Sequence, residues 1–163
     1  MWFSGSQMKI EPHNLTVLID KREQRPWSVD PLRKKEATLQ TGDYSILGLE
    51  SHIAIERKSL DDLMGCIGKG RERFERELDR LRAYPCRYVI VEANWGDIEA
   101  GSYRSKIHPN AAMGSICAWM ARGIPFLFAG RSDRAGKLAC RIMYRYAVDR
   151  AREATFLVES LKS

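Results

Sequence analysis

The sequence predicts a single α/β domain in which helices pack against both faces of a mixed β-sheet. Short apolar runs rich in β-branched residues recur along the chain, and amphipathic segments with helical spacing follow several of them. Strands alternating with helices favour a layered arrangement around one sheet. The 163 residues suffice for one domain with a sizeable core, and no linker, repeat or low-complexity tract divides them.

The first half of the chain predicts a β-meander. Residues 1–14 show no periodicity and are expected to form a loose N-terminal arm, so the domain is expected to occupy residues 15–163. Residues 15–19 are an apolar run suited to a buried strand. Two further strands, over 46–49 and 53–55, are expected to pair through a tight turn.

The second half alternates helices and strands. Ser59 and Asp62 form a capping-box pattern that marks the first helix start. The remaining expected elements are a glycine break near Lys69, a resumed helix that Pro85 stops, a strand over 87–91, a polar stretch over 94–106, a helix from Pro109 to Gly123, a strand over 125–129 and a long helix from Asp133.

The charge balance favours a polyanionic partner. The chain has 27 Lys and Arg against 21 Asp and Glu, a formal net charge of +6 and a pI near 9.3. Binding of basic side chains to phosphates releases condensed counterions, which makes nucleic acid a candidate partner. Charge alone is equally compatible with an ordinary basic surface.

The cysteines and histidines give no sign of a zinc site or a catalytic triad. No cysteine pair has zinc-ligand spacing, so reduced core thiols are expected at Cys66, Cys86, Cys117 and Cys140. The histidines are scattered along the chain. The apolar runs are too short to cross a bilayer and the N-terminus lacks a signal layout, so we expect no membrane partner and an intracellular location, in the cytoplasm or the nucleoid or nucleus.

A carboxylate and a Glu-x-Lys pair point to metal-assisted phosphodiester hydrolysis. Asp43 follows a glycine at the start of a strand, while Glu56 and Lys58 are spaced two apart on a later strand and therefore share one face. Arg57 faces the other way. Carboxylates can hold a divalent cation that activates water, and a lysine can orient the water or the phosphate. By itself this pattern is weak.

The surrounding residues strengthen the interpretation. The segments Thr41-Gly42-Asp43-Tyr44-Ser45-Ile46 and Ile55-Glu56-Arg57-Lys58-Ser59-Leu60-Asp61-Asp62 resemble the GDx(n)ERKx3D motif of the XPF-family (ERCC-type) nuclease domain. Upstream, Leu18-Ile19-Asp20-Lys21-Arg22-Glu23 looks like the D-x-R-E element of that family, and Gly70-Arg71 matches a recurrent position. The resemblance covers residues 15–147 and implies a restriction-endonuclease-like fold of the PD-(D/E)xK superfamily, with a central mixed β-sheet flanked by helices.

The resemblance also implies roles for individual residues. Asp43 and Glu56 would bind Mg²⁺ or Mn²⁺, Lys58 would orient water or phosphate, and Asp20 would be a further acid near the metal, acting through water. The supporting positions would be Arg57, Arg22, Glu23 and Asp62.

Each supporting position has a purely structural alternative. Asp62 can be a helix N-terminal acid, Arg57 can brace its strand through an ion pair, and Asp20 can cap a turn. Arg22 and Glu23 can be an exposed charge cluster. These alternatives stay open at the level of sequence.

A basic segment follows the glycine break. We expect Lys69, Arg71 and Arg73 to contact the DNA backbone, because flexible glycines let the main chain approach phosphates. A solvated helix face explains the same residues equally well.

The expected function is structure-specific incision of branched DNA, such as flaps and forks. The main alternative is a non-catalytic DNA-binding or scaffold subunit of a nuclease complex. A third, an enzyme acting on small phosphate esters, lacks a glycine-rich phosphate loop, since Gly68-Lys69-Gly70 is too short. The family resemblance implies a homodimer, with helical segments 115–122 and 137–146 as possible seams that core packing would also explain, and a possible helicase or helix-hairpin-helix partner.

Overall fold

A computed structural model describes residues 9–162 and shows a mixed, six-stranded sheet with helices on both faces. The strand order is β2-β1-β3-β4-β5-β6. The β1/β2, β4/β5 and β5/β6 pairs are parallel, whereas β3 runs antiparallel to both β1 and β4. The predicted α/β fold with a mixed central sheet is therefore confirmed.

The strands are short, as expected from the apolar runs. They are β1 (Thr16–Asp20), β2 (Arg33–Ala37), β3 (Tyr44–Ile46), β4 (Ile53–Lys58), β5 (Cys86–Val91) and β6 (Phe126–Phe128).

Helices fill the rest of the chain. They are α1 (Leu60–Ile67), α2 (Arg71–Leu81), α3 (Trp95–Glu99), α4 (Pro109–Ala121) and α5 (Ser132–Ser160). The predicted cap at the start of α1 is present, because the Ser59 hydroxyl accepts a hydrogen bond from the Asp62 backbone N–H and donates to the Asp62 carboxylate. The helical pattern breaks between α1 and α2 at the predicted glycines. No helix among residues 9–162 is long and apolar enough to cross a membrane.

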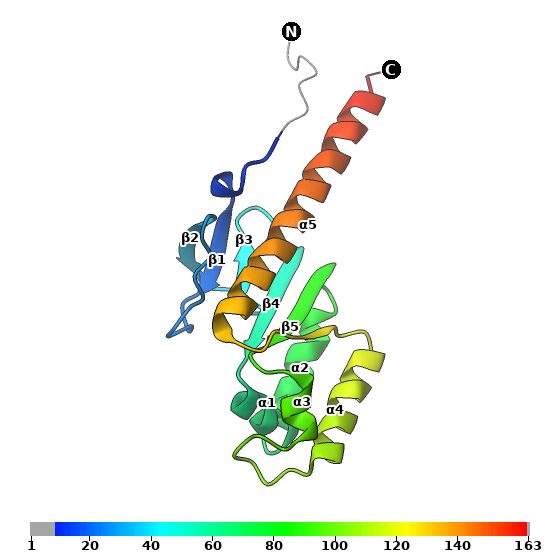
Figure 1. Cartoon of the computed structure of the whole chain (residues 1–163). Helices are drawn as coiled ribbons and strands as arrows, with labels where there is room; N and C mark the ends of the chain where they lie inside the picture. The colour runs from blue at the N-terminus through cyan, green and yellow to red at the C-terminus, as the bar shows by residue number, and fades with distance from the viewer. Residues whose placement is uncertain (1–8, 163) are drawn as a thin grey trace.

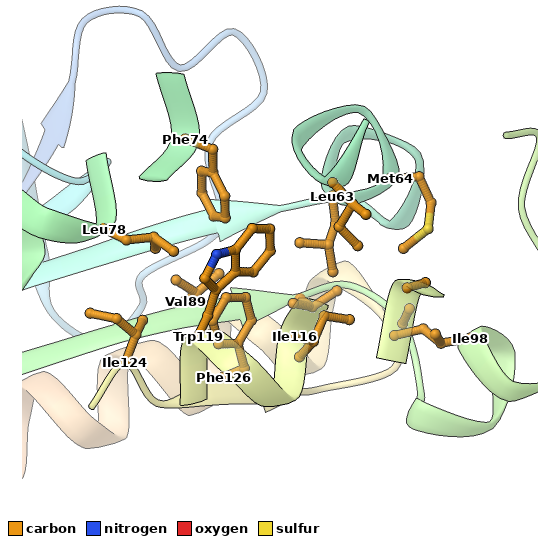
Figure 2. Close-up of a cluster of buried hydrophobic side chains, with 14 of the residues drawn as sticks. Leu63, Met64, Phe74, Leu78, Val89, Ile98, Ile116, Trp119, Ile124 and Phe126 are labelled. Carbon is orange, nitrogen blue, oxygen red and sulfur yellow. The ribbon is translucent and has the colours of Figure 1, made fainter. Parts of the chain in front are cut away.

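One hydrophobic core lies between β4, β5 and the helices α1, α2 and α4. Trp119 of α4 is at its centre, where its ring meets Phe74 edge-on at 5.1 Å and stacks on Phe126 at 6.0 Å (Figure 2). Trp119 and Ile116 are fully buried here. Core packing therefore accounts for the apolar periodicity of segment 115–122.

The second core lies on the opposite face, beneath α5. Figure 1 shows this helix crossing the sheet and continuing past it towards the C-terminus. Ala135, Ala139 and Met143 of α5 pack against apolar side chains of β1, β3 and β4. Gly136 is needed at this contact, since a Cβ there would lie 2.8 Å from Trp27 Cβ. Core packing also explains the buried positions of segment 137–146.

Several expectations at the level of elements need correction. The strand expected over 46–49 is β3, over Tyr44–Ile46, because residues 47 and 48 already form the turn before β4. The segment around residue 35, where no element was expected, contains an edge strand, β2, and the polar stretch over 94–106 contains α3, which begins with an Asn94 capping box.

Two further observations concern the cysteines and the arm. All four cysteines are free, but Cys117 is exposed rather than in the core. Of the expected N-terminal arm, residues 1–8 lie outside the described part of the chain. Pro12–Asn14 forms a 3₁₀ turn, and the Tyr144 hydroxyl donates a hydrogen bond to the Ile10 carbonyl at 2.8 Å.

The two sheet faces differ in coverage, which decides where a site can form. The α1–α4 layer packs on β4, β5 and β6. On the same face, an open groove lies over Leu18 of β1 and Lys35 of β2, and a cavity beside α2 reaches Glu56 and Lys58 at the carboxyl end of β4.

Candidate active site

Gly42 brings Asp43 against the end of β4. Its backbone has φ +77°, and a Cβ at this position would lie 3.1 Å from the Ile55 carbonyl oxygen, so the close approach requires glycine. The Asp43 backbone N–H donates a hydrogen bond to the Ile55 carbonyl oxygen at 2.8 Å. One Asp43 carboxylate oxygen accepts a hydrogen bond from the Arg57 backbone N–H, also at 2.8 Å. The predicted Gly-Asp step is therefore fixed by the main chain of the strand that carries Glu56.

Glu56 and Lys58 share one face of β4, as their spacing predicts. Lys58 Nζ lies 2.8 Å from Glu56 Oε1, and both side chains are largely buried, with exposed fractions of 16% and 10%. The Lys58 ammonium also lies over the Phe74 ring of α2, 5.1 Å from its centroid. The pair is thus held between the sheet and a helix.

These side chains line one cavity of about 240 Å³ at the carboxyl end of β4. Asp43, Glu56 and Lys58 contribute from the sheet side. The other lining residues are Arg22, Gln40, Thr41, Gly42, Glu77, Arg80 and Leu81. The structure therefore brings together the three residues on which the predicted chemistry depends, in a cavity that also contains two arginines.

Burial and nearby negative charge perturb both carboxyl groups of the cavity. Burial, together with the nearby negative charge of Glu56, raises the pKa of Asp43 to about 8. Burial also raises the pKa of Glu56, while the Lys58 ammonium opposes this shift. Both carboxyl groups line the same cavity. Carboxyl groups with perturbed pKa values in a cavity are candidates for a functional site.

Lys58 remains a cation in this environment. Burial alone would lower the pKa of its ammonium group, but the adjacent Glu56 carboxylate outweighs that effect and raises the pKa above its usual value. Lys58 can therefore donate hydrogen bonds to an anion or to water at neutral pH.

Arg57 faces away from the cavity and is enclosed by acids. Its guanidinium pairs with Glu92 at 2.8 Å and with Glu23 at 3.1 Å, donates to the Arg25 carbonyl, and lies 5.2 Å from the Trp27 ring centroid. Neither acid is exposed by more than a fifth of its side chain. Arg57 and Glu23 therefore brace the end of β4, which matches the structural alternative for Arg57.

The same brace includes Tyr44 and Trp27. The Tyr44 hydroxyl donates to Glu23 at 3.1 Å and accepts from the Trp27 backbone N–H, while the two rings stack at 4.6 Å. The Trp27 indole N–H donates to Glu92 at 2.7 Å. Every polar group of this cluster has a hydrogen-bond partner, so Tyr44, the residue after Asp43, is held in a fixed position.

Asp20 lies near the cavity but directs its carboxylate elsewhere. It accepts from the Arg22 guanidinium at 2.6 Å and from the Leu39 backbone N–H at 2.9 Å, and it does not line the cavity. Burial opposes ionisation, but these hydrogen bonds outweigh it and lower the pKa of Asp20. Arg22 itself is largely exposed and does line the cavity, so Asp20 positions a cation at its rim.

The remaining predicted residues lie outside the cavity. Asp62 caps α1. Lys69 and Arg73 are exposed around the α1–α2 break. Arg71 is committed to packing, since it pairs with Glu75 at 3.1 Å, donates to the Ser115 hydroxyl at 2.9 Å and lies over the Trp119 ring.

Glu77 and Arg80 belong to the cavity and were missed by sequence reasoning. Helical spacing alone favours an exposed Arg73–Glu77 pair on the outer face of α2, comparable to the Glu72–Arg76 pair, which forms at 2.8 Å. Glu77 instead lines the cavity. A signal was available, because Glu77 is three residues after the buried Phe74 and therefore borders the apolar stripe of the helix.

The donor set suits a hard divalent cation held partly by substrate. No cluster of three or more acidic, histidine or cysteine side chains is preassembled for a metal within residues 9–162. Mg²⁺ commonly binds through one or two carboxylates, several waters and the phosphate oxygens of its substrate. Asp43 and Glu56 provide that number of carboxylates in a polar, accessible cavity.

The part of the chain that forms the cavity matches a known protein family. The model of the ERCC4 domain family matches residues 19–142, which include every cavity residue. The chain belongs to the ERCC4-domain family. The predicted resemblance is therefore confirmed over most of the domain.

Solved structures support the same fold for this ERCC4 domain. XPF from Aeropyrum pernix superposes with a TM-score of 0.65 at 19% identity, covering 80% of this chain and 61% of that chain. XPF from Aeropyrum pernix in complex with DNA gives a TM-score of 0.63 at 19% identity, with 81% and 64% covered. The chain thus spans somewhat less than two thirds of either protein. No curated protein matches it in a sequence search.

Proposed function

We propose that this ERCC4 domain is a metal-dependent endonuclease that hydrolyses phosphodiester bonds in branched DNA. The observation that carries the proposal is the convergence of Asp43, Glu56 and Lys58 in one cavity. One of the structures with this fold is a complex with DNA. The net positive charge of the chain is consistent with the same class of substrate.

The cavity residues divide into two chemical roles. Asp43 and Glu56 would hold Mg²⁺ or Mn²⁺, which supplies charge neutralisation at the phosphate and a more acidic bound water. Lys58 would orient the attacking water or a phosphate oxygen, because its ammonium stays protonated beside Glu56. Asp20 would act on the metal through water, if at all, since its oxygens accept hydrogen bonds from Arg22 and Leu39.

The arginines of the cavity would bind the substrate backbone. Arg22 projects from the β1 end, with its guanidinium anchored on Asp20, and Arg80 approaches from α2. A guanidinium presents paired donors that match phosphate geometry. Arg57 stays on the opposite face and acts by holding β4 and donating its backbone N–H to Asp43.

Incision of defined DNA substrates tests the proposal. The protein is incubated with end-labelled fork, flap and linear duplexes in Mn²⁺ or in EDTA. We expect cutting near the branch in Mn²⁺, none in EDTA, and loss of cutting with retained binding for Glu56→Ala. Glu36→Ala, on the exposed edge strand β2, is the matched control and should cut normally.

The alternative function predicts a different outcome in the same assay. A non-catalytic DNA-binding or scaffold subunit would bind branched DNA without cutting it in any metal. The presence of Asp43, Glu56 and Lys58 in one cavity argues against that alternative, because the acids and the lysine that the reaction would need are all in place.

We also propose that the domain acts as a homodimer. Apolar side chains are exposed along the end of α5, including Phe156 at 75% and Leu161 at 78%. Exposed apolar patches of this kind mark interaction sites. Light scattering at micromolar concentration should give twice the monomer mass, and a single species at monomer mass would exclude the dimer. A helicase or helix-hairpin-helix protein remains a proposed further partner.

A further inference from the structure

An open groove continues from the active-site cavity along the uncovered half of the sheet. It has a volume of about 640 Å³ and is floored by Leu18 of β1 and Leu39. Gln40 lines both the groove and the catalytic cavity, so the two spaces adjoin. The groove is therefore an extension of the candidate active site.

The strand register explains why the groove exists. Leu18 pairs with Lys35 of the parallel edge strand β2, so both side chains point to the face that carries Glu56 and Lys58. Leu47, in the turn after β3, lines the same groove and is 51% exposed. Leu18 and Leu39 are nearly buried at the bottom of the groove, with exposed fractions of 4% and 8%, so Leu47 is the large apolar side chain that the groove exposes most.

The walls of the groove combine an aromatic ring with positive charge. Tyr84, just after α2, lines the groove and is half-buried, and the exposed Lys35 of β2 lines it as well. Arg22 stands at the adjoining cavity. Glu50, at the end near the β3–β4 turn, is the acidic group of the groove, and its carboxylate accepts a hydrogen bond from the Gly48 backbone N–H.

This composition fits unpaired nucleotides and not a duplex. A base in a duplex is stacked between its neighbours and hides both faces, so it cannot stack on an aromatic ring of the groove. An unpaired base exposes both faces and can stack on an aromatic ring, while lysine and arginine follow the backbone. Tyr84, the exposed Leu47 and Lys35 provide these contacts next to the candidate active site.

We propose that the groove formed by Leu18, Lys35, Leu39, Leu47 and Tyr84 binds the unpaired nucleotides that adjoin the scissile phosphate. The inference rests on the proposed function and deepens it, since it assigns the preference for branched DNA to this domain itself. A linear duplex would fill the catalytic cavity with a phosphate but leave the groove empty.

Binding measurements on the full chain in EDTA test the groove without cleavage. The probe is a duplex with a single-stranded tail that carries the fluorescent base 2-aminopurine at the first unpaired position, and a blunt duplex is the comparison. Wild type should bind the tailed DNA more tightly and quench the fluorescent base by stacking. Tyr84→Leu should remove the quenching and weaken tail binding about 5- to 100-fold, with less than a twofold effect on the blunt duplex.

Neighbouring lysines provide a matched pair of variants. Lys35→Glu should weaken binding of tailed DNA about tenfold or more relative to the blunt duplex. Lys34→Glu introduces the same charge change one residue away on β2, but Lys34 pairs with Val17, which packs beneath α5 on the other face. It should affect both DNAs equally. Thermal unfolding of each variant verifies that it is folded.

The outcomes separate this inference from the proposed nuclease function. Equal losses on tailed and blunt DNA for Lys35→Glu and Tyr84→Leu, or no loss on either, would overturn the groove whether or not the protein cuts. A dimer that dissociates on Leu47→Glu, with tail binding unchanged, would also overturn it, because a second copy would then occupy the groove. Selective loss of tail binding supports it, even if wild type fails to cut in Mn²⁺, in which case only the nuclease proposal falls.

Discussion

The charged side chains on the two faces of β4 have different surroundings. On one face, Arg57 is enclosed by Glu23, Glu92 and the Trp27 ring, and each polar group of this brace has a partner. On the other face, Lys58 pairs with Glu56, and the neighbouring Asp43 adds a second buried carboxyl to the same cavity. Adjacent residues of one strand thus belong to two different environments.

The difference separates what holds the site from what reacts. The brace on the Arg57 face has matched charges, so it stabilises the strand and positions Asp43 through the Arg57 backbone N–H. The cavity face brings together two carboxyls whose pKa values are raised by burial and by nearby negative charge. Such an arrangement is costly without a cation, and a divalent metal would relieve it.

Neutralising an acid on the cavity face should have the largest effect. Glu56→Gln keeps the shape of the side chain but removes a metal ligand, so we expect cleavage to fall by about 10³-fold, since metal stabilisation of the transition state amounts to several kcal/mol. Initial rates in Mn²⁺ measure this. The free energy of unfolding should change far less than for Arg57 variants, and a variant that cuts at the wild-type rate would remove Glu56 from the site.

Breaking the brace should instead damage stability. Arg57→Met leaves Glu23 and Glu92 without their partner in a largely buried cluster, and we expect the free energy of unfolding to fall by about 3 kcal/mol. Urea unfolding with and without the substitution measures the loss. Arg57→Lys should recover only part of it, because an ammonium cannot reproduce the planar, multidentate contacts. Full stability in Arg57→Met would contradict the assignment of this face.

The raised pKa of Asp43 predicts a pH dependence for the metal-free protein. The folded carboxyl holds its proton up to about pH 8, whereas the unfolded one releases it near 3.8, so the folded state binds more protons in that window. The free energy of unfolding should therefore decline as pH rises from about 4 to 8. Asp43→Asn cannot lose this proton, so in EDTA it should gain stability relative to wild type between pH 5 and 8.

Excess Mn²⁺ provides the control for that pH dependence. A cation bound to the ionised carboxylates favours the deprotonated folded state, so wild type should regain stability at pH 8 while Asp43→Asn should not. Parallel stability profiles of the two proteins in EDTA, at every pH, would show that Asp43 titrates normally.

The exposed basic residues near the α1–α2 break should have the smallest effect. Lys69 and Arg73 were predicted to contact the DNA backbone, and both are exposed. Replacing each by Gln should reduce the slope of log binding constant against log salt by about 1 per lost phosphate contact. Arg71→Gln should mainly lower stability, since Arg71 packs on Trp119 and pairs with Glu75. An unchanged salt slope in the double variant would remove Lys69 and Arg73 from the interface.

The sequence was informative where geometry is local. Glu56 and Lys58 share a face because strands repeat every two residues, and the Gly42-Asp43 step precedes a strand whose pairing with β4 follows from a tight turn. The cap formed by Ser59 and the glycine break after α1 depend only on neighbouring residues. These features could be predicted without knowing how the elements pack.

The sequence was less informative where elements distant along the chain meet. Glu77 enters the cavity because α2 packs against β4 in one orientation, and helical spacing alone placed it on the outer face. The brace joins Trp27, Arg57 and Glu92, which lie far apart in the sequence. The hydrogen bonds and ion pair between them could not be predicted from any one segment of the sequence. The groove beside the cavity exists because the helices cover only half of one face.

A titration with Mn²⁺ followed by electron paramagnetic resonance tests the central claim most directly. The claim is that Asp43 and Glu56 share one divalent cation beside Lys58. Wild type should show a saturable Mn²⁺ site that both Asp43→Asn and Glu56→Gln weaken strongly, whereas Glu36→Gln leaves it intact. Binding of Mn²⁺ to both active-site variants with wild-type affinity would place the cation elsewhere and contradict the account.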